Sequence, residues 1–311
     1  MKYGFAGVRH GVATAMILLF ASIVHAQQLG HYVDGITGLE NGSTAPPGLY
    51  IGYLPYISLI HSIKGPDGNT AVNVDLNLVD HNAVYQVTTT RKFLGASYGL
   101  GVIVPIVNTR FQANVIDKTA QTAGVSDIYF SPVTLGWEKG KFNYLLNYGF
   151  YAPTGDFNPS APMNPGLGFW EHQIQAGTTA NIDAKKLWNA SVLSTWEISH
   201  SKTGLDVKTG PQASFEYSFG RRFHKYSMNA GLAGYAATKL SADSGSGINP
   251  LLRGDLDHAF AAGPEFKYTS VKHHFAFDAR YERQFGVQLR TSGDVIVFSL
   301  TYLNFIIPNK K

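Results

Sequence analysis

Five charged residues near the C-terminal end of the chain have a spacing that could bring their side chains together in a functional site. Glu265 and Lys267 alternate along one predicted strand, and Asp278, Arg280 and Glu282 alternate along the next. Alternate residues of a strand point to one face of a sheet, so these side chains are expected to converge. They could form a charged constriction that selects a permeant molecule. The alternative, which the pattern favours, is a structural salt-bridge network, because confined charges must pair.

The same alternation predicts that further polar side chains, on other predicted strands, line the lumen. The predicted lumen-lining residues are Glu171, Gln173, Gln175, Glu216, Glu265, Lys267, Asp278, Arg280, Glu282 and Gln284. Tyr151 and Tyr235 are expected on the same side. They could make a hydrophobic path for aromatic molecules, or they could simply fill gaps between larger side chains.

Catalytic chemistry finds little support in the sequence. His200 stands between two serines, Ser199 and Ser201, in a pattern that resembles the Ser–His pair of some membrane-embedded hydrolases. Consecutive residues of a strand point to opposite faces, so adjacent partners there would not meet. The chain has no cysteine, and it has no phosphate-binding loop or metal-ligand motif. We therefore predict no enzymatic activity, no cofactor and no metal site.

The elements that would position these residues are strands with one apolar face. In the stretch KFNYLLNYGFYAPTG, residues 141–155, alternate positions are aromatic or apolar: Phe142, Tyr144, Leu146, Tyr148 and Phe150. The opposite face is mostly small and polar. Residues 168–182, 210–220, 258–270 and 273–287 repeat this pattern, with Arg283 as an exception on the apolar face of the last one. The period of two predicts β structure throughout.

The predicted strands number about twelve, separated by turn-rich segments. They are expected near residues 48–60, 73–90, 95–110, 124–138, 141–153, 168–182, 187–200, 210–220, 226–240, 258–270, 273–287 and 293–306. Short turns alternate with long loops rich in Gly, Pro, Ser and Asn, among them 61–71, 115–124, 155–168, 201–210 and 241–255. Short turns at one end and long loops at the other are typical of outer-membrane barrels.

The apolar faces are predicted to contact lipid. Charged residues make up only 15% of the chain, against ~25% in typical soluble domains. In a bilayer every backbone polar group must be paired, so the sheet closes, its apolar face meets the acyl chains, and its polar face lines a lumen. Aromatic residues near strand ends suit the two membrane interfaces: Tyr53, Tyr56, Trp137, Trp170, Trp188, Trp196, Tyr226 and Tyr302. We predict an all-β fold, a closed antiparallel transmembrane barrel of about twelve strands.

The N-terminus has the pattern of a cleaved secretory signal peptide. Lys2 and Arg9 precede an apolar stretch that ends at Ala26. Cleavage there removes two basic residues and lowers the formal net charge from +4 to +2, so we predict no nucleic-acid partner. The predicted organisation is a signal peptide (1–26), a lead or plug segment at the periplasmic end (27–47) and an outer-membrane barrel (48–311).

Several strings occur in a familiar order. They include PPGLYIGYLPY (46–56), LGASYGLGVIVPIV (94–107), GVSDIYFSPVTLGW (124–137), NYGFYAPTGDFN (147–158) and AAGPEFKY (261–268). This order resembles the outer-membrane family known from the MetA pathway of phenol degradation, over nearly the whole mature chain. The resemblance implies an outer-membrane barrel that is often linked to the catabolism of aromatic compounds and is loosely called a transporter. It implies no catalytic or ligand-binding residue.

The predicted function is diffusion of small hydrophobic or aromatic compounds across the outer membrane. Loops 155–168 or 241–255 are expected to gate the outer mouth. The expected partners are the lipid bilayer, a small-molecule permeant and the barrel assembly machinery, which reads a last strand that ends on the aromatic Phe305. The alternatives are a non-conducting structural or adhesive surface barrel and, less favoured, a lipid-modifying enzyme.

Overall fold

A computed structural model describes residues 29–113, 118–161, 163–223, 225, 227–248 and 256–305. The predicted signal peptide and the tail after Phe305 lie outside these residues. The strands are β1 (Gly48–Lys64), β2 (Thr70–Phe93), β3 (Ala96–Ala113), β4 (Lys118–Val125), β5 (Ile128–Lys139), β6 (Phe142–Ala152), β7 (Glu171–Asn181), β8 (Trp188–Ser199), β9 (Gln212–Phe223), β10 (Met228–Lys239), β11 (His258–Ser270), β12 (Phe275–Gln288) and β13 (Thr291–Phe305). No helix within the described ranges is both long and apolar enough to cross a membrane.

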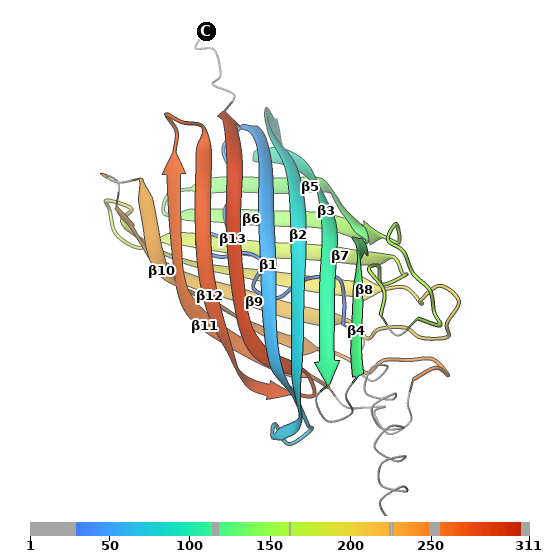
Figure 1. Cartoon of the computed structure of the whole chain (residues 1–311). Coiled ribbons are helices and arrows are strands. Elements are labelled where there is room, and N and C mark those ends of the chain that lie inside the picture. The colour runs from blue at the N-terminus through green and yellow to red at the C-terminus, as the bar shows by residue number, and fades with distance from the viewer. Residues whose placement is uncertain are drawn as a thin grey trace, which may run out of the picture.

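These strands form one closed antiparallel barrel (Figure 1). Except at β4, neighbours in sequence are neighbours in the sheet, and β1 pairs with β13 from Gly48↔Phe305 to Ile63↔Thr291, which closes the wall. The circuit contains twelve strands, because β4 pairs only with β3 and lies outside it. Closure leaves the circuit without a free edge, so its backbone groups are paired within the wall. The predicted fold class and strand count are confirmed.

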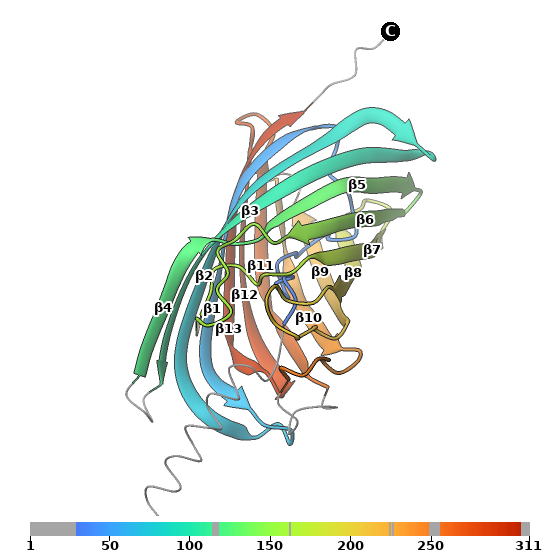
Figure 2. The ribbon, with the colours of Figure 1, turned by 90° about the vertical axis from the view of Figure 1, so that its right-hand side faces the viewer.

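The strand β4 corrects one sequence-based expectation. Residues 115–124 were expected as a long loop, but β3 continues to Ala113 and Lys118–Val125 pairs with it as a hairpin. In Figure 2 β4 lies at the outer edge of the sheet that β1, β2 and β3 form, because the end of β3 still pairs with β2. The strand is then interrupted at two residues, Ser126 and Asp127, and the next strand, β5, pairs with β3. The loop prediction was wrong because small polar residues such as those of KTAQTAG also suit a water-exposed hairpin.

The connections between strands are short at one end of the barrel and long at the other, as predicted. At the end where β1 starts and β13 finishes, the turns between β2 and β3 and between β5 and β6 contain two residues each. At the opposite end, long segments join β6 to β7, β8 to β9 and β10 to β11. The connection from β1 to β2 is shorter than the predicted loop 61–71, because β1 extends to Lys64 and β2 begins at Thr70.

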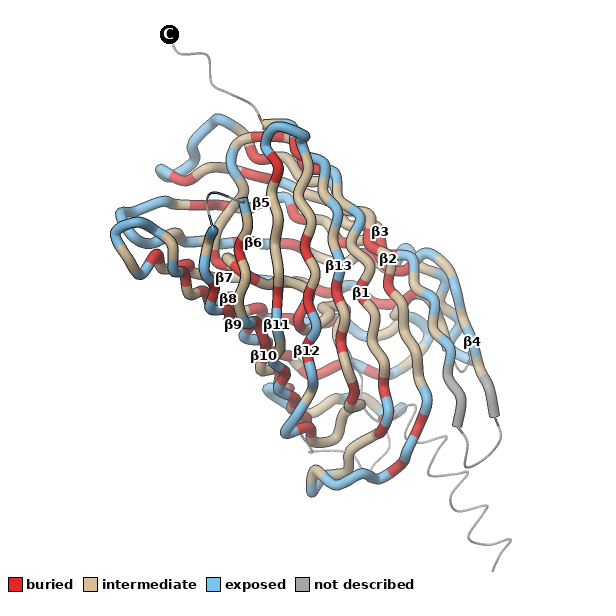
Figure 3. The backbone as a smooth tube through the Cα atoms, turned by 60° about the vertical axis from the view of Figure 1, so that its left-hand side comes forward, coloured by how far each residue is buried: buried red, intermediate tan, exposed pale blue. Residues whose placement is uncertain are grey.

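Side chains alternate between the two faces of the wall as predicted. On β9, Phe215, Tyr217 and Phe219 are 39–48% exposed, whereas Ser214, Glu216 and Ser218 are buried. Figure 3 shows buried positions alternating with more exposed ones along β8 and β9. On this strand the aromatic side chains therefore point outward, and the polar ones point into the barrel. Tyr56 is an exception to the predicted interface set, since it is buried and faces inward.

Candidate functional site: the barrel interior

The interior of the barrel holds the chain's own N-terminal segment, residues 29–47. The segment has no strand of its own, and Figure 1 shows it as a blue trace behind the wall. It packs closely against the strands, because a Cβ on Gly42 would lie 2.1–2.4 Å from the backbone of Thr178 on β7. Gly35 has a positive φ of 80°, which favours glycine. These glycines let the segment approach the wall.

Four buried glutamates bind the backbone of this segment, and we call them the acidic ladder: Glu171, Glu197, Glu216 and Glu265. Glu171 accepts a 2.8 Å hydrogen bond from the amide of His31, and Glu197 accepts one of 2.8 Å from Tyr32.

Further along the segment, Glu216 accepts amide hydrogen bonds from Gly35 and Thr37, and Glu265 accepts one from Leu39. Each hydrogen bond fixes both the distance and the direction between a glutamate oxygen and a backbone amide. The acidic ladder thus fixes the path of the segment through the barrel.

Basic side chains of the wall bind the segment's carbonyl and carboxylate groups. Lys267 Nζ donates to the Leu39 carbonyl at 2.8 Å, and Arg280 donates to the Gly35 carbonyl. Arg290, in the turn between β12 and β13, lies 3.1 Å from the carboxylate of Asp34. These bases offset part of the negative charge of the acidic ladder, so the segment and the wall form one ionic network.

His31 joins the segment to the break in the wall. Its Nε2 lies 2.8 Å from Asp127 and its Nδ1 lies 3.2 Å from Glu171. Its ring stacks on Tyr151 with centroids 4.6 Å apart, and Phe169 meets it edge-on. Burial alone would lower the pKa of His31, but its hydrogen bonds with Asp127 and Glu171 raise that pKa above the ordinary value. The imidazole therefore favours the charged form.

Asp127 also holds the connection between β6 and β7. It accepts hydrogen bonds from the backbone amides of Gly155, Leu167 and Gly168 at 2.9, 2.8 and 3.3 Å. Burial alone would raise the pKa of Asp127, but the hydrogen bond with His31 and those from Gly155 and Leu167 lower it below the ordinary value. One carboxylate therefore links the wall, the 155–168 connection and the N-terminal segment.

The opposite side of the interior carries apolar clusters. Tyr56, Val295 and Val297 form a buried cluster on β1 and β13, and Val33 of the segment packs against it together with Leu54 and Leu78. Ile60, Val72 and Val74 form a second buried cluster farther along β1 and β2. The interior thus has a carboxylate-rich side and a side that offers non-directional apolar contact.

The predicted lumen-lining residues divide by burial. Those below 10% exposure are Glu171, Gln173, Glu216, Glu265, Asp278, Arg280 and Glu282, and those of intermediate exposure are Gln175, Lys267 and Gln284. Arg280 lies 3.5 Å from Glu265 and 3.3 Å from Glu282. Three charges of the cluster, Glu265, Arg280 and Glu282, are thus ion-paired, and the part of the cluster in selecting a permeant stays a prediction.

The two tyrosines nominated for a hydrophobic path contact other interior groups. Tyr151 stacks on His31. The hydroxyl of Tyr235 accepts a 2.7 Å hydrogen bond from Gln284, and its ring lies beside Gly35. Both side chains thus lie next to the N-terminal segment, and the path itself stays a prediction.

Sequence reasoning missed several interior residues. Glu197 shares its face of β8 with Thr195 and Ser199, so the alternation that nominated Glu171 could have found it. His31, Asp34 and Asp127 lie outside the strands, where no period marks their orientation. The hydrogen-bond partners of His31, for example, are 96 and 140 residues away in sequence. No local sequence pattern indicates contacts over such separations.

Solved structures share this architecture. The COG4313 outer membrane channel from Pseudomonas putida F1 is similar with a TM-score of 0.72 at 11% identity, over 88% of this chain and 100% of that one. The β domain of the Bordetella autotransporter BrkA is similar with a TM-score of 0.50 at 10% identity, over 82% and 99% of the two chains. At these identities the similarity shows the fold, which is that of outer-membrane barrels.

Sequence comparison identifies the family. No curated protein matches the chain significantly. A family model described as "Putative MetA-pathway of phenol degradation" matches residues 61–300, more than half of the chain. The resemblance noted in the sequence is thereby confirmed, and the chain belongs to this family.

Proposed function

We propose that this protein is a channel in the bacterial outer membrane through which small hydrophobic or aromatic compounds diffuse. The closed barrel with an apolar outer face supports this location, because such a wall leaves no unpaired backbone group in hydrocarbon. The phenol-degradation family and the channel named among the similar structures support transport. The last strand ends at Phe305, which suits recognition by the barrel assembly machinery.

The observation that carries the proposal is the non-covalent filling of the barrel. Residues 29–47 occupy the interior and are held by hydrogen bonds, ion pairs and packing. We propose that this segment is a plug. Contacts of this kind can be released without breaking a covalent bond, so the same barrel can be closed or open.

The apolar side of the interior supports hydrophobic permeants. Val295, Val297 and Tyr56 present buried apolar surface, and an apolar compound would gain transfer free energy there of roughly 25 cal/mol for each Å² buried. Aromatic compounds small enough to pass beside the acidic ladder would use this side. The surface that Val33 covers in the plugged state is the one that such a compound would contact.

We propose no enzymatic role for the serine and histidine pair. Ser199 points inward and donates a 2.5 Å hydrogen bond to Glu171, whereas His200 is exposed and its ring lies 5.3 Å from that of His172. The two side chains are on opposite faces of the wall. A serine nucleophile and its base must be within hydrogen-bonding reach.

Conductance in a planar bilayer tests the proposal. The full-length mature protein is compared with a variant that lacks residues 29–43 and keeps the start of β1. We expect low or intermittent conductance from the mature protein and a several-fold larger conductance from the variant. Uptake of a phenol by a strain that lacks the protein, before and after complementation, tests the permeant class. A variant that stays insulating while it migrates as a folded barrel would favour the structural or adhesive alternative.

A further inference from the structure

The outer surface of β1, β12 and β13 changes from apolar to charged at one level. Along β13, Tyr302, Leu300 and Phe298 are 40–54% exposed, and Ile296 continues this face up to Asp294. The register places Asp294 between Leu59 of β1 and Arg283 of β12. From Tyr302 to Asp294 the strand rises ~26 Å, or about 20 Å along the membrane normal at the usual tilt. The charged level therefore marks the edge of the apolar band.

Asp294 organises the polar side chains at this level. It accepts hydrogen bonds from Arg283 Nη1 at 2.7 and 2.8 Å and from the Tyr281 hydroxyl at 2.8 Å. His61 Nε2 lies 3.2 Å from it. The Asp294 side chain is 16% exposed, whereas those of Arg283 and His61 are 60% and 56% exposed. The surface offered outward therefore belongs mainly to the basic groups.

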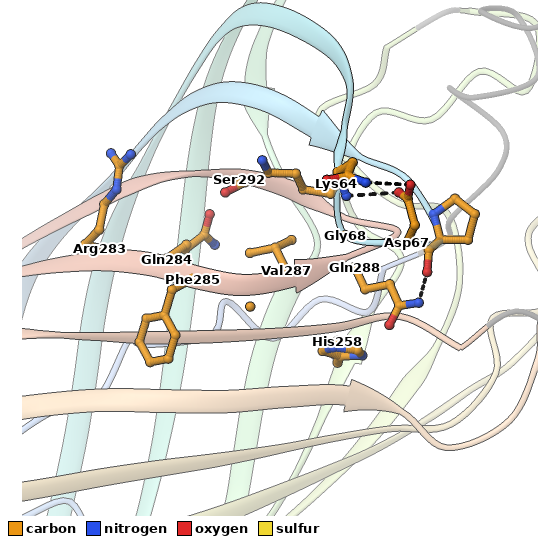
Figure 4. A pocket seen from close by; sticks show the side chains of 13 residues that line it. Lys64, Asp67, Gly68, His258, Arg283, Gln284, Phe285, Val287, Gln288 and Ser292 are labelled. Atoms are coloured by element: carbon orange, nitrogen blue, oxygen red, sulfur yellow. Dashed lines mark hydrogen bonds between the residues drawn. The ribbon is translucent and has the colours of Figure 1, made fainter.

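A cavity of about 620 Å³ adjoins this cluster at the end that carries the long loops (Figure 4). Lys64, His258 and Arg283 line it together with Phe285. Its one carboxylate, Asp67, accepts hydrogen bonds from the amide and side chain of Asn69 at 2.9 and 2.7 Å. The Phe285 ring stacks on Phe260 at 6.0 Å, and both face outward. The cavity thus combines basic groups with an apolar edge.

We propose that this cavity and the Arg283–Asp294 cluster bind the phosphorylated sugar headgroup of an outer-leaflet glycolipid. The proposal rests on the proposed outer-membrane location. A guanidinium whose orientation is fixed by a carboxylate suits a phosphate group, which it can bind through two parallel hydrogen bonds. Lys64 adds a second cation, and the acyl chains would lie on the apolar band below. The volume falls within the ~300–1,000 Å³ of ligand sites.

The test measures binding of lipid A to the purified protein in detergent by native mass spectrometry. The ligands are lipid A with its phosphates, the same lipid without them, and inorganic phosphate. The variants are Arg283→Gln with Lys64→Gln, the milder Arg283→Lys, and Arg221→Gln as a control. Arg221 is an exposed arginine at the other end of the barrel, over Trp188 and Phe223 at 5.4 and 5.1 Å.

We expect the double variant to bind phosphorylated lipid A about tenfold more weakly, the Arg283→Lys variant to lose part of the affinity, and Arg221→Gln to bind normally. Dephosphorylated lipid A should bind the wild type as weakly as the double variant binds the intact lipid. Equal binding of both lipids, or unchanged affinity in a variant that migrates as a folded barrel, overturns the proposal. Inorganic phosphate that binds as tightly as the lipid also overturns it.

Conductance in bilayers free of this glycolipid separates the two proposals. A barrel that conducts but does not discriminate phosphorylated from dephosphorylated lipid contradicts the lipid site alone. A barrel that binds the lipid but conducts neither with nor without residues 29–43 contradicts the channel alone.

Discussion

The two sides of the barrel interior hold the same N-terminal segment by different physical means. On the side of β7, β8 and β9, Glu171, Glu197 and Glu216 accept hydrogen bonds from its backbone amides. On the side of β1 and β13, the cluster of Tyr56, Val295 and Val297 packs against Val33, and the Tyr56 hydroxyl adds one 2.9 Å hydrogen bond to the Asp34 carbonyl. Hydrogen bonds are directional, whereas apolar contact is non-directional. The first side fixes the position of the segment, and the second leaves a surface that an apolar molecule can share.

The largest expected effect comes from the acidic ladder. In a Glu216→Ala variant, the amides of Gly35 and Thr37 lose their acceptor, at a cost of about 3 kcal/mol in binding of the segment. We expect higher open probability in planar bilayers and faster proteolysis of residues 29–47. Ser218→Ala is the matched control, because Ser218 is buried on the same face of β9 and its hydroxyl has no hydrogen-bond partner among the described residues. Equal behaviour of the two variants would contradict the holding role of Glu216.

The next effect concerns the apolar side. A Val297→Asn variant removes apolar contact worth roughly 1.5 kcal/mol, so hydrophobic permeants should pass about tenfold more slowly. Ion conductance should change little, because Val297 makes no polar contact with the segment. Ser299→Asn, on the same face of β13, is the control for side-chain size. If ion conductance and phenol uptake fall together, the two sides of the interior do not have separate roles.

A smaller effect is expected from pH, through His31. Its pKa is raised by its hydrogen bonds with Asp127 and Glu171, against the lowering effect of burial. A raised pKa means that the charge-dependent stabilisation is fully present below about pH 6.5 and is lost as pH rises through the folded value. Open probability should therefore increase toward alkaline pH, and His31→Gln should flatten this dependence. An identical pH profile in wild type and variant would falsify the role of His31.

The smallest effect is expected near the end of the segment that leads into β1. The Ser43 hydroxyl accepts a single 3.0 Å hydrogen bond from Asn143. Ser43→Ala should therefore weaken the binding of the segment to the barrel wall by about 1 kcal/mol. Proteolysis of the segment should quicken slightly, with no resolved change in conductance. A response as large as that of Glu216→Ala would show that this end, rather than the acidic ladder, holds the segment.

The fold could be predicted from the sequence because each strand carries its own signal. Alternation assigned Phe215 to the outside and Glu216 to the inside, and the same rule applied residue by residue would have included Glu197. Tyr56 was misassigned because aromatic residues occur both at interfaces and inside barrels. The path of residues 29–47 was beyond prediction, since its contacts join residues such as Leu39 and Glu265, 226 positions apart.

The seam between β1 and β13 has a consequence for assembly. It joins Gly48 to Phe305, so it is the pairing that must await synthesis of the last strand. The N-terminal segment leads directly into β1, and chains rarely thread through closed loops as they fold. A segment that already lies within the curved sheet when the seam forms avoids such threading. We therefore expect the wall to close around its own N-terminal segment as a late folding step, and a cargo bulkier than this segment to hinder closure.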